Sequence, residues 1–140
     1  MARRVADLTS PQDYVFVAGS EPQILDYAQR LSPTRFTIAY PMMIPTPLAL
    51  GYQQEAIRDL ARCRPSFIAR ARSRTSWLNQ AGTPSEFLKF LDRILAEEYD
   101  RVGGYVLGNQ RGRWVAPLSA QDVPDASLVL FRRKAVGSGK

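Results

Sequence analysis

Residues 14–22 read YVFVAGSEP, an apolar run that ends in a turn and leads into a helix signal. The run Tyr14–Ala18 is apolar or aromatic at every position, which is typical of a strand covered on both of its faces. Gly19 ends the run, and Ser20 followed by Gln23 matches the capping box at the start of a helix. Because a buried strand passes directly into a helix, the segment predicts a chain of the α/β class.

The segments after this strand–helix unit repeat the alternation of strand and helix patterns. We expect a second strand over Phe36–Tyr40, a helix that begins at Pro47, and a third strand over Ser66–Ser73. In the third strand Arg70 and Arg72 lie on the same face, which favours a position at the edge of the sheet. With right-handed crossovers, the three parallel strands then take the order 3-2-1 in a three-layer, Rossmann-like sheet.

The second half contains one strong helix pattern and then several strand patterns. The helix is expected to start near Thr83, and its apolar stripe consists of Phe87, Phe90, Leu91, Ile94 and Leu95. Three further strands are expected over Val102–Leu107, Arg113–Ala116 and Leu128–Phe131. A hairpin loop at Gly108–Gly112 would join the first two of them. These strands predict an antiparallel extension of the parallel sheet.

The composition predicts one domain rather than several. The chain has 140 residues, of which 45% are hydrophobic and 23% are charged, and a chain of this size builds a single core. We expect one α/β domain over residues 1–134 and a flexible basic, glycine-containing tail over 135–140. No run of about eighteen apolar residues is present, and residues 1–7 do not resemble a signal peptide, so the isolated chain is expected to be soluble.

Several kinds of catalytic and metal site are excluded by residues that the chain lacks. It has no histidine and a single cysteine, Cys63, so it holds no Ser-His or Cys-His nucleophile pair, no internal disulfide and no cysteine-rich zinc site. The turn after the first strand has one glycine, Gly19, where a dinucleotide fingerprint needs three, and Glu21 places negative charge where a phosphate would lie. We therefore expect no cofactor, no metal and no catalytic residue.

The positive charge of the chain is concentrated in one region. Nineteen Lys and Arg residues accompany thirteen Asp and Glu residues, giving a net charge of +6. Between Ala56 and Arg74 there are six arginines and one acidic residue, Asp59. Such a cluster is typical of a solvated face, or of a surface that meets lipid phosphates or another anionic partner. Nucleic acid is not expected, because the arginines are not interleaved with aromatic residues and no recognition motif is present.

Polar side chains follow the expected parallel strands at their carboxyl ends, where α/β proteins bind ligands. They are Glu21, Tyr40, Arg74, Ser76 and Trp77. A carboxylate, a phenol, a guanidinium, a hydroxyl and an indole that converge on one crevice would bind a polar ligand such as a sugar. The alternative is that Glu21 only complements a helix N-terminus and that Trp77 packs against a helix end.

A proline-rich loop after the second expected strand places Met42, Met43 and Ile44 in a surface connection. These side chains either fold back onto the sheet or dock on a partner or membrane surface, a role to which the adaptable methionine side chain is suited. Arg70 and Arg72 are the candidate contacts to the phosphates of lipid headgroups near such a surface.

Four segments taken together carry a resemblance to a known family. They are Tyr14–Ile24, Ser32–Phe36, Tyr40–Met42 and Thr75–Leu78. They resemble the extracytoplasmic C-terminal region of bacterial polytopic membrane glycosyltransferases, the family 39-like enzymes related to protein mannosyltransferases and to aminoarabinose transferases of lipid A. The resemblance covers most of the chain.

The resemblance implies a non-catalytic accessory domain on the periplasmic face of the inner membrane. Such a domain packs on, or presents substrate to, the transmembrane glycosyltransferase module of the same polypeptide, which uses a polyprenyl-phosphate sugar donor and carries the catalytic acidic residues itself. It also implies anionic lipid headgroups or the polyprenyl-phosphate carrier as partners. The residues alone leave a second hypothesis open, a module that binds a sugar or sugar phosphate at the crevice described above. A stand-alone enzyme is disfavoured, since no nucleophile motif is present.

Overall fold

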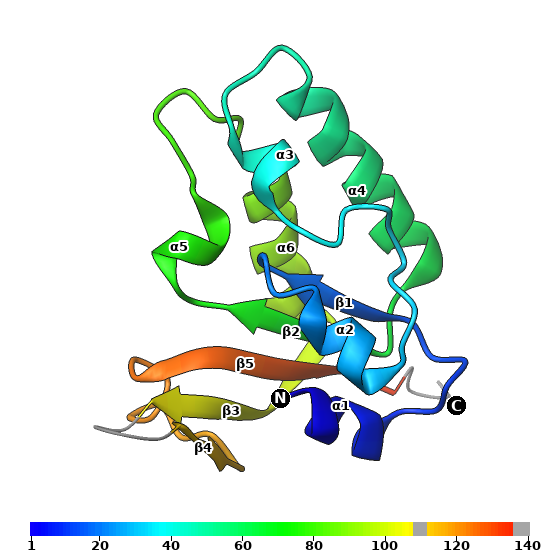
Figure 1. The fold of residues 1–140 in the computed structure, drawn as a ribbon, viewed down its shortest axis with the longest axis vertical. Coiled ribbons are helices and arrows are strands. Elements are labelled where there is room, and N and C mark those ends of the chain that lie inside the picture. Colours follow the sequence, from blue (N-terminus) through cyan, green and yellow to red (C-terminus); the bar gives the residue numbers. More distant parts are fainter. Residues whose placement is uncertain (108–111, 136–140) are drawn as a thin grey trace.

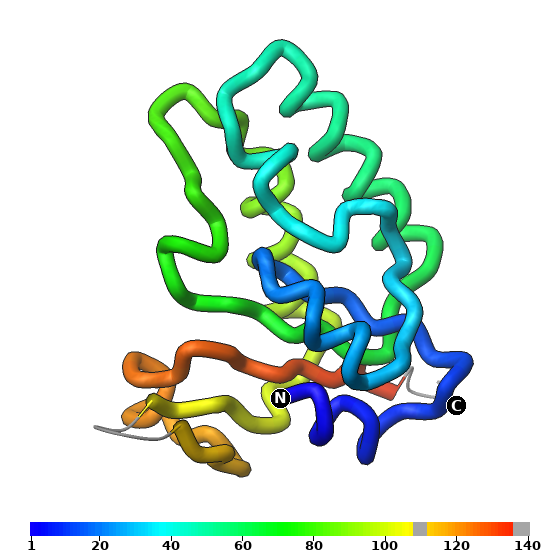
Figure 2. The backbone as a smooth tube through the Cα atoms, in the orientation of Figure 1, coloured from blue at the N-terminus to red at the C-terminus, as the bar shows by residue number. Residues whose placement is uncertain are grey.

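The structure is a computed structural model that describes residues 1–107 and 112–135. The strands of its sheet are β1 (Val15–Ala18), β2 (Phe67–Ala71), β3 (Tyr99–Leu107), β4 (Gly112–Val115) and β5 (Ala126–Arg133). Their order is β1-β2-β5-β3-β4, with β1 and β2 parallel and the other neighbouring pairs antiparallel. Figure 1 shows β5, the last strand in the chain, between β2 and β3. The backbone tube in Figure 2 shows how the end of the chain comes back to this position.

Helices cover both faces of the part of the sheet that β1 and β2 form (Figure 1). They are α1 (Ala2–Leu8), α2 (Gln23–Ala28), α3 (Tyr40–Met43), α4 (Ala49–Cys63), α5 (Arg74–Trp77) and α6 (Glu86–Glu97). Because side chains alternate along a strand, Val15 and Val17 pack with α1 and α2, while Phe16 packs with α3, α4 and α6. The molecule is therefore a mixed α/β fold with an apolar core on each face of its sheet.

The elements with the strongest sequence patterns are confirmed. The strand β1 is buried at each of its positions, and the helices α4 and α6 each bury one apolar face. The antiparallel extension is confirmed as well, because β3 pairs with both β4 and β5. In the predicted hairpin loop, residues 108–111 lie outside the described residues, and so do residues 136–140 of the predicted tail.

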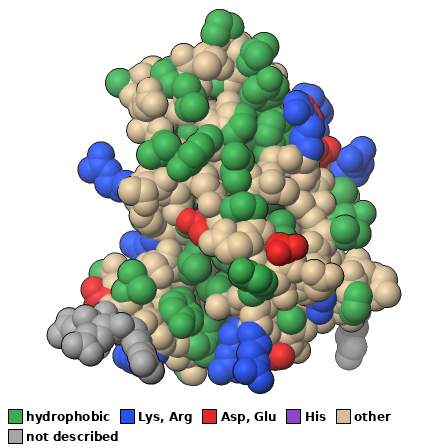
Figure 3. All heavy atoms as spheres, viewed as in Figure 1, with side chains coloured by type: hydrophobic (Ala, Val, Ile, Leu, Met, Phe, Trp, Pro, Cys, Tyr) green, Lys and Arg blue, Asp and Glu red, His purple; other side chains and the backbone are tan. Residues whose placement is uncertain are grey.

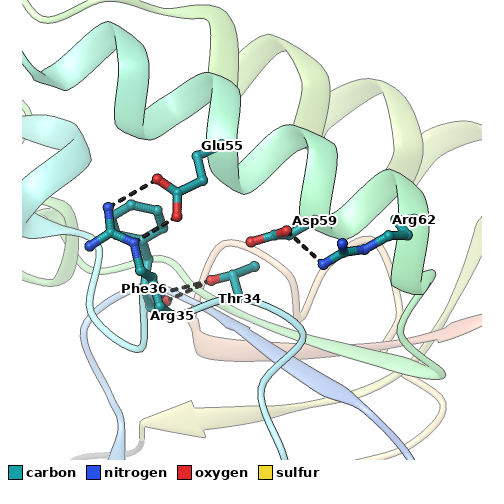
Figure 4. A network of polar contacts seen from close by, with 6 residues as sticks. All are labelled: Thr34, Arg35, Phe36, Glu55, Asp59 and Arg62. Atoms are coloured by element: carbon teal, nitrogen blue, oxygen red, sulfur yellow. Dashed lines mark hydrogen bonds and ion pairs between the residues drawn. The ribbon is translucent and has the colours of Figure 1, made fainter.

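The prediction of a second strand over Phe36–Tyr40 is wrong. The Oγ1 of Thr34 accepts a hydrogen bond from the main-chain N–H of Phe36 at 2.9 Å, and Arg35 forms a two-armed ion pair with Glu55 of α4 at 2.6 and 2.9 Å (Figure 4). These bonds fold the segment against α4 instead of extending it. Phe36 and Ala39 are buried and the residues between them are exposed, a spacing of three that a strand does not produce.

The predicted strand order 3-2-1 and the edge position of the third predicted strand are also wrong. That strand exists as β2, but it lies between β1 and β5. Arg70 is tolerated in a central strand because Asp92 of α6 pairs with its guanidinium at 2.6 Å. With one parallel pair in the sheet, the Rossmann-like arrangement expected from the sequence is not confirmed.

Two hydroxyl groups that lie where helices were expected to start, those of Ser20 and Thr83, form hydrogen bonds elsewhere in the fold. The Oγ of Ser20 donates to the main-chain oxygen of Ser76 at 2.6 Å and accepts from the N–H of Ala39 at 3.2 Å, while α2 begins without a side-chain cap. The Oγ1 of Thr83 donates to the main-chain oxygen of Met43 at 2.6 Å. Both hydroxyl groups therefore tie distant loops together rather than starting their own helices.

Tyr99, at the start of β3, is buried with 5% of its surface exposed, and its hydroxyl donates to the main-chain oxygen of Pro65 at 2.7 Å. Burial of the phenol raises its pKa from 10.0 to about 12. The folded chain therefore keeps this proton at pH values where the unfolded chain has lost it. Stability must then fall as pH rises between 10 and about 12, by about 1.4 kcal/mol per pH unit from this group.

We expect the variant Tyr99→Phe to show a shallower loss of stability over that alkaline range, because it removes the titrating group. Near neutral pH the same variant loses about 1 kcal/mol, since the Pro65 carbonyl loses its donor. Urea unfolding at a series of pH values measures both effects. The control is Tyr27→Phe, whose ring is 76% exposed, and equal alkaline slopes for wild type and Tyr99→Phe would contradict the assignment.

Candidate functional site

A cavity of about 680 Å³ lies beside the carboxyl end of β2. Its walls come from α5, from the first turn of α6 and from the sheet face formed by β2, β5 and β3. Figure 1 shows α5 directly after the end of β2, with β5 and β3 next along the sheet. The guanidinium groups that line it belong to Arg70, Arg72, Arg74 and Arg101, and its apolar surface comes from Trp77, Leu88, Val123, Val129 and Phe131. The cavity thus combines positive charge with apolar walls.

The strand register explains why these side chains meet. Arg70 is paired with Val129, and Phe131 is paired with both Ile68 and Arg101. Paired residues in neighbouring strands point to the same face of a sheet, so Arg70 and Arg101 lie on one face with Val129 and Phe131 between them. This is the face that α6 covers only in part, which leaves the cavity open.

The charges in the cavity are unbalanced. Arg70 is paired with Asp92 at 2.6 Å, and Arg72 donates from Nη1 to the main-chain oxygen of Val123 at 2.7 Å. Within residues 1–107 and 112–135, neither Arg74 nor Arg101 forms an ion pair or a side-chain hydrogen bond. Only one of the four guanidinium groups is therefore paired with a carboxylate, and this favours an anion in the cavity.

The short helix α5 fixes two of the cavity residues. The Oγ of Ser73 accepts from the N–H of Thr75 at 3.3 Å at the start of the helix. The indole Nε1 of Trp77 donates to the main-chain oxygen of Ala71 at 2.9 Å, which holds the ring against the end of β2. Arg74 and Trp77 therefore reach the cavity from the same short helix.

The other three residues of the predicted crevice come together, but away from this cavity. The Oγ of Ser76 donates to Glu21, whose second carboxylate oxygen accepts from the N–H of Ser20 at 2.8 Å. The hydroxyl of Tyr40 lies 3.4 Å from the main-chain oxygen of Thr75. These bonds join α5 to the turn after β1. The predicted set therefore divides into a polar network of Glu21, Tyr40 and Ser76, and the two cavity residues Arg74 and Trp77.

Gly19 is required where β1 meets this network. A Cβ at this position would lie 2.6 Å from the Cβ of Ala71 and would also meet the carboxylate of Glu21, and the backbone φ is +155°. Only glycine allows the turn after β1 to approach β2 so closely.

The expectation that Met42 and Met43 form a docking surface does not hold in this fold. Their exposed fractions are 1% and 0%, because the segment forms the short helix α3 and turns both side chains into the core shared with α4 and α6. Met42 and Met43 therefore follow the alternative in which the loop folds back onto the protein. Ile44 differs from them, because 38% of it is exposed.

Sequence reasoning missed Arg101, Val129 and Phe131 as cavity residues. Arg101 lies in a strand predicted only from Val102 onward, and no local pattern shows which strand will become its neighbour.

Among the residues that the structure describes, no three His, Cys, Asp or Glu side chains gather as metal ligands. No helix in the described ranges is long and apolar enough to cross a membrane.

No protein-family model matches the chain, and searches among curated proteins and solved structures also found no match.

Proposed function

We propose that the chain is a binding domain for a small ligand that carries a phosphate group, in the class of sugar phosphates. The observation that carries the proposal is the cavity with four guanidinium groups and one paired carboxylate. The planar guanidinium group matches the geometry of phosphate oxygens and forms charge-assisted hydrogen bonds with them. Arg74 and Arg101, which have no ionic partner among the described residues, are the groups we assign to the phosphate.

The rest of the cavity suits the remainder of such a ligand. The indole of Trp77 and the apolar side chains of Val129 and Phe131 offer surface to a sugar ring or to a short apolar chain. The volume of about 680 Å³ is within the usual range for small-molecule sites. Asp92 is held in an ion pair by Arg70, and the role that we assign to the cavity is binding of the ligand.

The glycosyltransferase resemblance adds a context to this proposal. In that context the domain lies at the extracytoplasmic face of a membrane, and the phosphate belongs to the polyprenyl-phosphate donor or to another substrate that the domain presents to a catalytic membrane module. The arginine side chains that line the cavity support this reading, because they favour an anionic ligand. The chain alone should then show no turnover, and sugar transfer from a polyprenyl-linked donor by the purified 140-residue chain would contradict it.

Binding of a hexose 1-phosphate should weaken by roughly 10-fold to 100-fold in Arg74→Gln and in Arg101→Gln, since each variant loses a charge-assisted hydrogen bond. Titration calorimetry measures the affinity. The fluorescence of Trp77, isolated in a Trp114→Phe background, reports on occupation of the cavity. Arg3→Gln is the matched control, because Arg3 is exposed on α1 at the other face of the sheet.

Two ligand controls sharpen this test. Inorganic phosphate should bind more weakly than the sugar phosphate, and the neutral hexose should bind more weakly still. Binding should also weaken with salt, because it depends on exposed charges. Equal affinity for the neutral sugar, or unchanged affinity in both arginine variants, would show that the cavity does not select phosphate.

A further inference from the structure

The four arginine side chains of the cavity are not equivalent. Arg70 is paired with Asp92 at 2.6 Å. Arg74 and Arg101 form no ion pair within the described residues, and the proposed function assigns both to a phosphate group. Arg72 also lines the cavity, is exposed and forms no ion pair in the same part of the chain. A single phosphate at Arg74 and Arg101 therefore leaves the guanidinium group of Arg72 without a counter-charge.

The guanidinium group of Arg72 is held in place by the main chain. Its Nη1 donates to the main-chain oxygen of Val123 at 2.7 Å. The N–H of Arg72 donates to the main-chain oxygen of Ser127 at 2.9 Å, which continues the pairing of β2 with β5 beyond the end of β2. Because a guanidinium group has five N–H donors, the bond to Val123 orients Arg72 and leaves most of its donors for a ligand.

Arg72 and Arg74 reach the cavity from neighbouring positions. They lie two residues apart in the segment that joins the end of β2 to α5, and both line the cavity. Figure 3 shows basic side chains that project from the side of the molecule where Figure 1 places α5. The two side chains are therefore suited to bind neighbouring anionic groups of one ligand.

The carboxylates on the adjoining segments, those of Glu21, Asp122 and Asp125, do not balance this charge. None of them lines the cavity or forms an ion pair with a cavity arginine in residues 1–107 and 112–135. Glu21 accepts a hydrogen bond from Ser76, and Asp122 accepts from the hydroxyl of Ser119 at 2.6 Å. The cavity therefore keeps three guanidinium groups for the charge of a ligand.

This charge favours a ligand with two phosphoryl groups over a ligand with one. A phosphate monoester carries at most about two negative charges near pH 7, and a diphosphate has an inner phosphoryl group that adds about one more. The total of about three negative charges matches the guanidinium groups of Arg72, Arg74 and Arg101, each of which can form charge-assisted hydrogen bonds with phosphate oxygens.

We propose that the ligand of the cavity is a sugar diphosphate. One phosphoryl group lies between Arg74 and Arg101, and the second lies at Arg72. The inference rests on the proposed function, because it names the ligand class of the same cavity. The apolar surface of Trp77 and Phe131 is then left for the sugar, as in that proposal.

Inorganic pyrophosphate and inorganic phosphate are the probes that test this inference, because they differ by one phosphoryl group. Titration calorimetry at constant ionic strength, without divalent cations, measures both affinities. We expect the wild type to bind pyrophosphate roughly 10-fold to 100-fold more tightly than phosphate. Arg72→Gln should weaken pyrophosphate binding by roughly 10-fold, since it loses charge-assisted hydrogen bonds, and should change phosphate binding by less than about twofold.

Arg132→Gln is the matched control. Arg132 is exposed on β5 and forms no ion pair among the residues that the structure describes. It follows Phe131, which lines the cavity, so its side chain points to the opposite face of the sheet. The preference for pyrophosphate over phosphate should be the same in Arg132→Gln and in the wild type. Retained phosphate binding in Arg72→Gln shows that the cavity of this variant is folded.

The outcomes separate the diphosphate from the proposed function. Equal affinity of the wild type for the two probes, or an equal loss of both affinities in Arg72→Gln, would overturn the diphosphate and leave a phosphate site. The same holds if citrate, a tricarboxylate of similar charge, binds as tightly as pyrophosphate, since the cavity would then respond to charge alone. A wild-type chain that binds neither phosphate nor pyrophosphate would reject the proposed function and this inference together.

Discussion

Replacement of Gln53 by alanine is expected to lower the free energy of unfolding by about 3–5 kcal/mol. The side chain of Gln53 has no exposed surface. Its amide nitrogen donates to the main-chain oxygens of Met42 at 2.8 Å and Pro84 at 2.7 Å, and its oxygen accepts from the N–H of Phe87 at 3.0 Å. One side chain therefore satisfies buried groups of three segments, and its loss leaves all of them without a partner.

Urea unfolding measures this change in the free energy of unfolding, and two further variants identify its cause. Gln53→Met keeps most of the volume and loses the hydrogen bonds, so it separates the polar contribution from the cavity that alanine creates. Gln54→Ala is the matched control, because Gln54 is exposed and its side chain makes one contact, at 3.4 Å, with Glu86. A midpoint for Gln53→Met equal to that of the wild type would show that the three hydrogen bonds contribute nothing net.

Phe87→Ala is expected to have a similar effect, about 3–5 kcal/mol of lost stability. Phe87 is fully buried in the first turn of α6 and meets Phe16 of β1 edge to face, with ring centroids 6.1 Å apart and planes at 75°. The ring joins α6 to the centre of the sheet, so its removal opens a cavity that the packed neighbours cannot fill.

Phe90→Ala is the matched control for this variant, since Phe90 lies on the same helix but is only half-buried. We expect it to cost about 1–2 kcal/mol, in proportion to the smaller apolar area that it covers. Urea unfolding curves of both variants measure the two losses of stability. If Phe90→Ala cost as much as Phe87→Ala, the core at this end of the sheet would not depend on the Phe16–Phe87 contact.

The sequence was sufficient to predict those elements in which the spacing of apolar residues matches the faces that are buried. β1 is apolar at every position because both of its faces are covered, and α6 has an apolar stripe because one side of it is covered. In each case the pattern and its cause lie within one short segment. The mixed α/β class and the antiparallel extension follow from such elements alone.

The strand order and much of the site depend on contacts between segments that are distant in the chain. Phe36–Tyr40 has strand-forming residues, but Thr34 and Glu55 bind the segment into a folded loop. The cavity needs β5 to pair with both β2 and β3, which places Arg101 beside Phe131. No local repeat encodes such a pairing, so sequence reasoning named Arg74 and Trp77, which line the cavity, but could not name Arg101.

The position of β5 has a consequence for the biosynthesis of the chain. Until residues 126–133 have been made, no strand can join β2 to β3, because β5 is the neighbour of both. A ribosome releases the chain from its N-terminus, so the nascent polypeptide must wait, with the β2 edge unpaired, for nearly all of these residues to emerge. A chain truncated before residue 126 should therefore be protease-sensitive, whereas the 140-residue chain should not.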